Sequence, residues 1–129
     1  MEIVHGRAEG PPGAAGQNFT GQVHKDRILN VDDVLRLGSI CFSPGARTYW
    51  HSHGDGQILQ VTSGQGRIAA EGESVQVIKA GDVIWTPPGE VHWHGADTET
   101  FLVHTAFSLG ATHWGKEVTP EEYDALAGE

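Results

Sequence analysis

Four side chains of this sequence could together bind a metal ion. His51 and His53 are two residues apart, and alternate side chains of a β-strand point to the same face. Two imidazoles would then lie side by side. The turn signal Gly54-Asp55-Gly56 follows, Gln57 begins the next apolar stretch, and His92 comes later in the chain. Imidazole is the commonest metal ligand in proteins, so this spacing indicates a metal site; surface or hydrogen-bonded histidines are the alternative.

The position of Gln57 supports the same interpretation. Leu59 and Val61 share its parity along the expected strand and are apolar, so Gln57 is predicted to face inward. An amide buried without a hydrogen-bond partner costs about 1–3 kcal/mol. A metal ion would supply that partner.

Short β-type segments separated by turn signals carry these residues. Runs of alternating or apolar residues end at Gly, Pro, Asn, Asp or Ser clusters, which is typical of an all-β sandwich or barrel. The expected strands are Leu35–Phe42, Thr48–His53, Gln57–Thr62, Arg67–Ala70, Ser74–Ile78, Asp82–Thr86, Val91–His94 and Phe101–Phe107.

The two ends of the chain differ from this pattern. Residues 1–21 contain the run Gly10–Gly16, which has no periodicity, and are expected to form a loose leader. At the other end, Thr119-Pro120-Glu121-Glu122 has the form of a capping box with proline at the first helical position. It predicts a helix to about Ala127. We expect an N-terminal leader or edge segment over 1–30 and a single domain over 31–129.

Size and charge limit the partners. The 129 residues suffice for one domain, and 17 acidic against 8 basic side chains give a net charge of −9. Such a chain is expected to bind neither nucleic acid nor membrane, which leaves a small-molecule substrate. Cys41 is the single cysteine and no segment resembles a secretory signal, so a cytoplasmic location is expected.

The glycine and proline framework around these histidines resembles the cupin superfamily. Residues 45–64 match its first motif, Gly45-x5-His51-x-His53-x3-Gln57-x6-Gly64, and residues 81–96 match its second, Gly81-x5-Pro87-x-Gly89-x2-His92-x3-Ala96. The resemblance implies an antiparallel jelly-roll barrel, or double-stranded β-helix, with a short C-terminal helix here. It also implies one divalent metal held by His51, His53, Gln57 and His92. Two residues depart from the family: Gln57 replaces the usual Glu and Ala96 the usual Asn.

A narrower resemblance covers nearly the whole chain. The small bacterial cupins that act as manganese-dependent hydroxynitrile lyases share the same ligand pattern, the stretch Pro44–Thr48 and the stretch Pro88–Gly95, apart from Val91. The resemblance implies a metal-dependent lyase that cleaves or forms cyanohydrins and needs no organic cofactor. Manganese is the first expectation for the metal; iron, zinc, nickel and cobalt suit three imidazoles and an amide as well.

His104 is the candidate catalytic base. It lies in an apolar strand pattern with Leu102 and Ala106 on its own face, so it is predicted to face the interior. The lyase-type relatives also have a histidine here, which implies a general base or an extra metal ligand; a structural, buried histidine is the alternative. The resemblance implies that Ile40 and Ser108 flank the substrate pocket. Tyr49, which has the parity of His51, is expected to line it too, as are Leu59 and His94.

Other functions stay open at this point. The same ligand set would serve an iron oxygenase or a metal-dependent cyclase or isomerase, and a non-enzymatic ligand-binding cupin is the third alternative. Family resemblance also implies a homodimer or homotetramer, in which residues 1–30 could form a swapped strand or flap.

Overall fold

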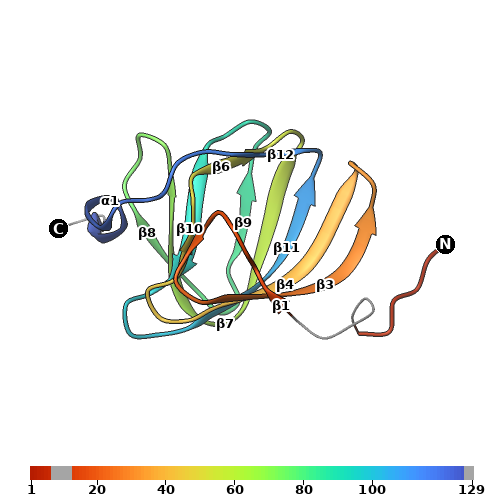
Figure 1. Ribbon diagram of the computed structural model, residues 1–129, viewed down its shortest axis with the longest axis horizontal. Helices are drawn as coiled ribbons and strands as arrows, with labels where there is room; N and C mark the ends of the chain where they lie inside the picture. The colour runs from red at the N-terminus through yellow and green to blue at the C-terminus, as the bar shows by residue number, and fades with distance from the viewer. Residues whose placement is uncertain (7–12, 127–129) are drawn as a thin grey trace.

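The computed structural model describes residues 1–6 and 13–126 and has one curled, antiparallel β-sheet with one short helix (Figure 1). This confirms the all-β prediction. The strands of the described residues are β1 (Gly13–Ala14), β2 (Phe19–Thr20), β3 (Val23–Val31), β4 (Leu35–Phe42), β5 (Arg47–Thr48), β6 (His51–His53), β7 (Gly56–Ala70), β8 (Gln76–Lys79), β9 (Val83–Thr86), β10 (His92–Ala96), β11 (Leu102–Leu109) and β12 (Thr112–Trp114), and the helix is α1 (Pro120–Asp124).

The long strand β7 joins the two halves of the barrel. The sheet runs β1-β3-β4-β11-β7-β10-β5-β2, with β8 and β9 also paired to β7 and with β6 paired to both β10 and β12. The first half of β7 pairs with β11 and β9, and the second half pairs with β10 and β8. The other strands that carry candidate site residues are therefore either neighbours of β7 or one strand further away.

The expected turn at residues 63–66 is wrong, because β7 continues through it. Gly64 has φ +81° and pairs with Leu102 of β11. The register with β11 shifts between Val103 and His104, where Thr62 has no register partner, so β7 contains a bulge there rather than a chain reversal. A Cβ at Gly64 would collide with the carbonyl of Phe101, and one at Gly66 with the carbonyl of Gly95. These glycines allow close packing of neighbouring strands.

The expected strand Thr48–His53 is interrupted in the middle. Tyr49 donates its N–H to the carbonyl of Asn18 at 2.8 Å, and Trp50 donates its N–H to the carbonyl of Lys116 at 3.0 Å. The backbone N–H groups of these two residues therefore bond to Asn18 and Lys116, which lie outside the strands. Because β5 ends before β6 begins, the alternation of side chains does not carry over from one to the other.

The N-terminal segment contributes more structure than the sequence indicates. β3 pairs with β4 of the same chain over Val23 to Val31, and β2 pairs with β5. Val23 is buried in the core, with Ala15 and Phe19 packed against it. The expectation of a loose leader is wrong for the described residues 13–21; residues 7–12 lie outside the described residues.

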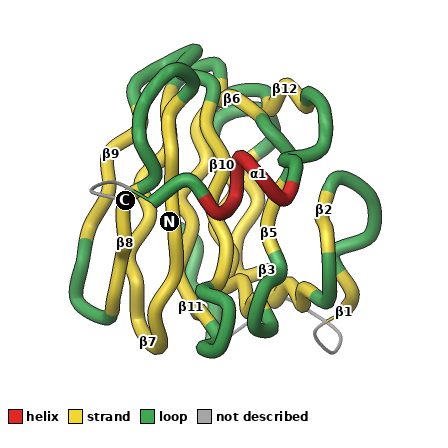
Figure 2. Tube along the Cα trace, turned by 90° about the vertical axis from the view of Figure 1, so that its left-hand side faces the viewer, coloured by secondary structure: helices red, strands yellow, loops and turns green. Residues whose placement is uncertain are grey.

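Two apolar cores hold the fold. The larger one fills the barrel between β4, β7 and β11, and a smaller one lies under the helix, where Trp93 packs on Tyr123. Figure 2 shows α1 outside the sheet, beside β10. The predicted capping box is confirmed at Thr119 and Glu122, although the helix ends at Asp124 and Ala127 lies outside the described residues. In the described part of the chain, no helix is long and apolar enough to cross a membrane.

Candidate metal centre

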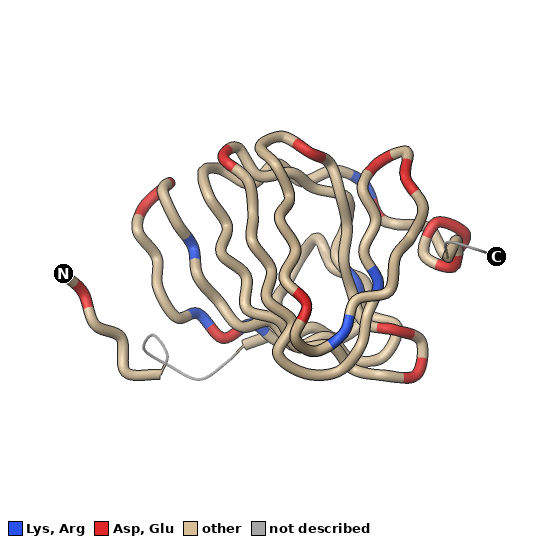
Figure 3. Tube along the Cα trace, turned by 180° about the vertical axis from the view of Figure 1, so that it is seen from behind, with Lys and Arg blue, Asp and Glu red and all other residues tan. Residues whose placement is uncertain are grey.

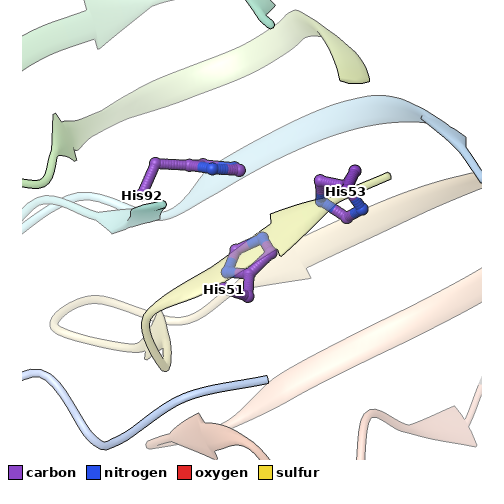
Figure 4. A group of neighbouring side chains, drawn as sticks. All are labelled: His51, His53 and His92. Carbon is purple, nitrogen blue, oxygen red and sulfur yellow. The ribbon is translucent and has the colours of Figure 1, made fainter. Parts of the chain in front are cut away.

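Three histidines from two neighbouring strands form the centre of the candidate site. His51 and His53 project from the same face of β6, and His92 of β10 is the register partner of His51. One ring nitrogen of each lies within 4.8 Å of those of the other two, as Figure 4 illustrates. All three side chains are buried. Strand pairing thus brings together two motifs that are about forty residues apart.

Hydrogen bonds to the backbone orient two of these rings. Nδ1 of His51 lies 2.9 Å from the carbonyl oxygen of Tyr49, and Nδ1 of His92 lies 3.0 Å from the carbonyl oxygen of Glu90. A carbonyl only accepts, so each Nδ1 carries the proton and each Nε2 keeps its lone pair. This is the arrangement that fixes the tautomer of metal-binding histidines.

The third ring is held by a side chain. Nδ1 of His53 lies 3.1 Å from Oγ1 of Thr112, which also accepts a hydrogen bond from Nη2 of Arg36 at 2.9 Å. A hydroxyl oxygen has two lone pairs and can accept both. Nε2 of His53 is buried and has no hydrogen-bond partner. A buried nitrogen without a partner is costly, and a metal ion would satisfy it, so the residues present fit a metal.

Gln57 faces inward and completes a neutral donor set. Its Nε2 donates to Oγ of Ser108 at 2.9 Å, and its Oε1 lies 3.1 Å from Nε2 of His92. The bond to Ser108 thus directs the amide oxygen, the metal-binding atom, toward the three histidines. Three imidazoles and one amide suit a divalent transition metal.

Burial keeps these histidines uncharged at neutral pH. Burial lowers the pKa of His51 and His92, and burial together with the neighbouring His92 and Arg36 lowers the pKa of His53 to about 3. A protonated imidazole cannot bind a metal. The low pKa values therefore leave the lone pairs of the three rings available near pH 7.

A cavity of about 340 Å³ lies against this centre. His51, His53 and Gln57 form part of its wall, together with the predicted pocket residues Ile40, His94 and Ser108. Its volume is at the lower end of the range of small-molecule sites. The cavity could therefore accommodate a compact organic molecule.

Two predicted pocket residues lie elsewhere. The parity of Tyr49 with His51 predicts a place in the pocket, but the break between β5 and β6 puts Thr48 in the cavity wall instead. Leu59 does face inward, as Gln57 does, but it is fully buried within the apolar core and does not line the cavity.

His104 lies in the cavity wall and pairs with His94. Nε2 of His104 and Nδ1 of His94 are 3.0 Å apart, and Phe42 packs against both rings. Burial lowers the pKa of His104 to about 4 and that of His94 well below its ordinary value. Among the described residues, the group of mutually close ligand atoms includes neither of them. Both rings are therefore uncharged near pH 7, and both line the cavity beside the candidate metal centre.

The strand β12 supports the site through two residues that have almost no signal in the sequence. Thr112 holds His53, and the indole of Trp114 lies over His51 with ring centroids 4.7 Å apart. The only available signal is the alternation of Thr112 and Trp114 between Gly110 and Gly115. Three residues are too few for a confident period, so the strand was not predicted.

Comparison with known proteins agrees with this architecture. Residues 38–106 match the family described as Cupin domain. The chain is 43% identical over 111 residues to an (R)-mandelonitrile lyase of Granulicella tundricola, covering 81% of this chain and 85% of that protein.

Solved structures give the same result. A cupin-like protein of Thermotoga maritima superposes with a TM-score of 0.84 at 38% identity, covering 99% of this chain and 100% of the other. The polyketide cyclase RemF of Streptomyces resistomycificus shares the fold at 16% identity and a TM-score of 0.72, covering 95% of this chain and 89% of that one. The family match and the close relatives together show that this chain belongs to the cupin family.

Proposed function

We propose that this protein is a metal-dependent lyase that cleaves small cyanohydrins into an aldehyde and cyanide, and forms them in the reverse direction. The observation that carries the proposal is the uncharged His94–His104 pair, which lines the same cavity as His51 and His53. The 43% identity to a protein named (R)-mandelonitrile lyase supports the choice of reaction.

The metal would be held by Nε2 of His51, His53 and His92 and by Oε1 of Gln57. A bound divalent cation, with manganese as our first choice, would supply Lewis acidity at the hydroxyl oxygen of the substrate. The unpartnered Nε2 of His53 and the orientation of Gln57 by Ser108 support this ligand set.

The histidine pair would move the proton. The neutral pair holds one proton in its shared hydrogen bond and one on an outer nitrogen, which leaves a bare outer nitrogen, either Nδ1 of His104 or Nε2 of His94. Both outer nitrogens lack a hydrogen-bond partner. We assign the acceptor role to Nδ1 of His104, with Nε2 of His104 donating to Nδ1 of His94.

The atoms of the reaction balance without an added oxidant or reductant. His104 removes the hydroxyl proton, the electrons of the O–H bond form the carbonyl, and the carbon–carbon bond to the nitrile breaks. The nitrile carbon leaves with the electron pair as cyanide and takes up the proton from His104 as hydrogen cyanide. The imidazolium is short-lived because burial disfavours its charge.

The test combines metal analysis with an enzyme assay. Elemental mass spectrometry of the purified protein should find about one divalent metal per chain, and chromatography should detect mandelonitrile formed from benzaldehyde and cyanide. His51→Ala should lose both the metal and the activity, whereas His113→Ala, at an exposed histidine of β12, should keep both. Bound metal without cyanohydrin formation or cleavage would refute the lyase assignment.

A further inference from the structure

The charge of the cavity is opposite to that of the chain. The chain carries a net charge of −9, yet three cationic side chains, Lys25, Arg27 and Arg36, line the cavity, and none of its described lining residues is Asp or Glu. Figure 3 shows basic residues on the strand pair at one edge of the sheet and others elsewhere, and acidic residues at turns and in the helix; β3 itself also contains Asp26. The positive charge of this cavity favours a negatively charged ligand.

Strand register places Lys25 and His104 on the same row of the sheet, two strands apart. Lys25 and His104 both pair with Ile40, one from β3 and one from β11. Adjacent strands are about 4.8 Å apart, so the backbones of Lys25 and His104 are roughly 10 Å apart across the sheet. A molecule of a few carbon atoms can therefore reach from the base to the cations.

The next row of the sheet provides the space between them. Arg27 pairs with Gly38, and Gly38 pairs with Ala106. All three residues line the cavity, and the small side chains of β4 and β11 leave it open between the histidines and Arg27.

Two of these cations, Arg36 and Lys25, contact uncharged groups. Nη2 of Arg36 donates to the carbonyl of Gly110 at 2.6 Å and to Thr112, both uncharged acceptors. Nζ of Lys25 lies 5.9 Å from the ring centroid of Phe19. Burial, followed by the charges of Arg27 and Arg36, lowers the pKa of Lys25. A bound anion would relieve this repulsion between like charges.

We propose that the substrate of this cavity carries an oxyanion, a carboxylate or a phosphate, which binds Lys25, Arg27 and Arg36. The placement of its reacting carbon beside His104 rests on the proposed lyase function. Guanidinium groups match both kinds of oxyanion through paired hydrogen bonds, and the three cations would select a charged aldehyde or cyanohydrin over a neutral one.

Binding to the wild-type protein tests this first. Isothermal titration with 4-carboxybenzaldehyde, 4-formylphenyl phosphate and the uncharged 4-formylbenzamide compares three probes of similar size. At least one anionic probe should bind about tenfold more tightly than the amide or better, and the tighter of the two identifies the anion. Equal affinity for all three would overturn the inference without the need for any variant.

Charge-removing variants then locate the effect. Arg27→Gln should lower the ratio of the affinity for the anionic probe to that for the amide by roughly threefold. The double variant Lys25→Gln, Arg27→Gln should bring this ratio close to one. Lys79→Gln, at an exposed position of β8 that does not line the cavity, removes the same charge and should leave the preference unchanged. An equal loss in Lys79→Gln would overturn the inference, because the effect would then come from net charge alone.

The same probes separate this inference from the proposed reaction. Preferential anion binding that Arg27→Gln weakens, without cyanohydrin formation from any aldehyde, supports the anion site and refutes the lyase function. Cyanohydrin formation with equal kcat/KM for charged and uncharged aldehydes supports the lyase function and overturns the anion site.

Discussion

Mild acid is expected to destabilise the metal-free protein through its buried histidines. The pKa is about 4 for His104 and about 3 for His53 in the folded state, against about 6.5 for histidine in an unfolded chain. Below pH 6.5 the unfolded chain therefore binds protons that the folded protein does not. The contribution of these uncharged histidines to the free energy of unfolding is fully present above pH 6.5 and falls as the pH drops below that value.

The size of the loss follows from the protonation of the unfolded state. At a pH of about 5.5, roughly 90% of unfolded histidine is protonated while little of folded His53 or His104 is, so each of these two residues lowers the free energy of unfolding by about 1 kcal/mol relative to pH 7.5. Together they contribute about 2–3 kcal/mol. The lowered pKa values of His51, His92 and His94 add to it in the same direction.

Urea unfolding followed by tryptophan fluorescence measures this loss. After removal of metal with a chelator, the free energy of unfolding should fall by at least about 2 kcal/mol between pH 7.5 and 5.5. His104→Leu should reduce the fall by about 1 kcal/mol, and bound metal should also reduce it because ligated nitrogens resist protonation. Stability that is constant or rises toward pH 5.5 would refute the uncharged, buried state of these histidines.

Three substitutions test individual roles. His104→Ala should lower kcat by roughly 10²- to 10⁴-fold in a mandelonitrile assay and keep the metal by elemental analysis; loss of metal would make His104 a ligand instead of a base. Gln57→Glu adds a negative charge to the metal centre, so metal should bind more tightly by competition with a chelator while kcat falls about tenfold; an unchanged rate would contradict the importance of a neutral donor set. Tyr123→Phe removes a buried hydroxyl that donates to the carbonyl of Ala96 at 2.6 Å, and urea unfolding should show a loss of about 1–3 kcal/mol; no loss would mean that solvent replaces this hydrogen bond.

Much of the fold was predictable from local signals. Apolar alternation located the main strands, because a half-buried strand repeats every two residues. The capping box at Thr119 predicted the start of the helix, because its hydrogen bonds form between residues three apart. The boundaries were less accurate at Gly64, since a glycine with positive φ occurs in turns and also inside a continuous strand such as β7.

The features of the candidate site also divide into those that a single strand determines and those that depend on distant parts of the chain. Spacing alone placed His51 and His53 on one strand face, and parity alone turned Gln57 inward, because both are properties of a single strand. The exclusion of Tyr49 from the cavity depended on a break between β5 and β6 whose hydrogen bonds go to distant parts of the chain. A local pattern does not contain that information.

Sequence by itself therefore determined the residue types of a neutral, histidine-rich site and the strands that carry them. Only the tertiary structure decided that Thr112 supports His53, that His94 pairs with His104, and that cations from β3 and β4 line the same cavity as the histidines. The physical reason is that these contacts are set by register between strands far apart in the chain. Pairing across the whole sheet selects that register, because shifting one strand by a residue would turn its buried face outward.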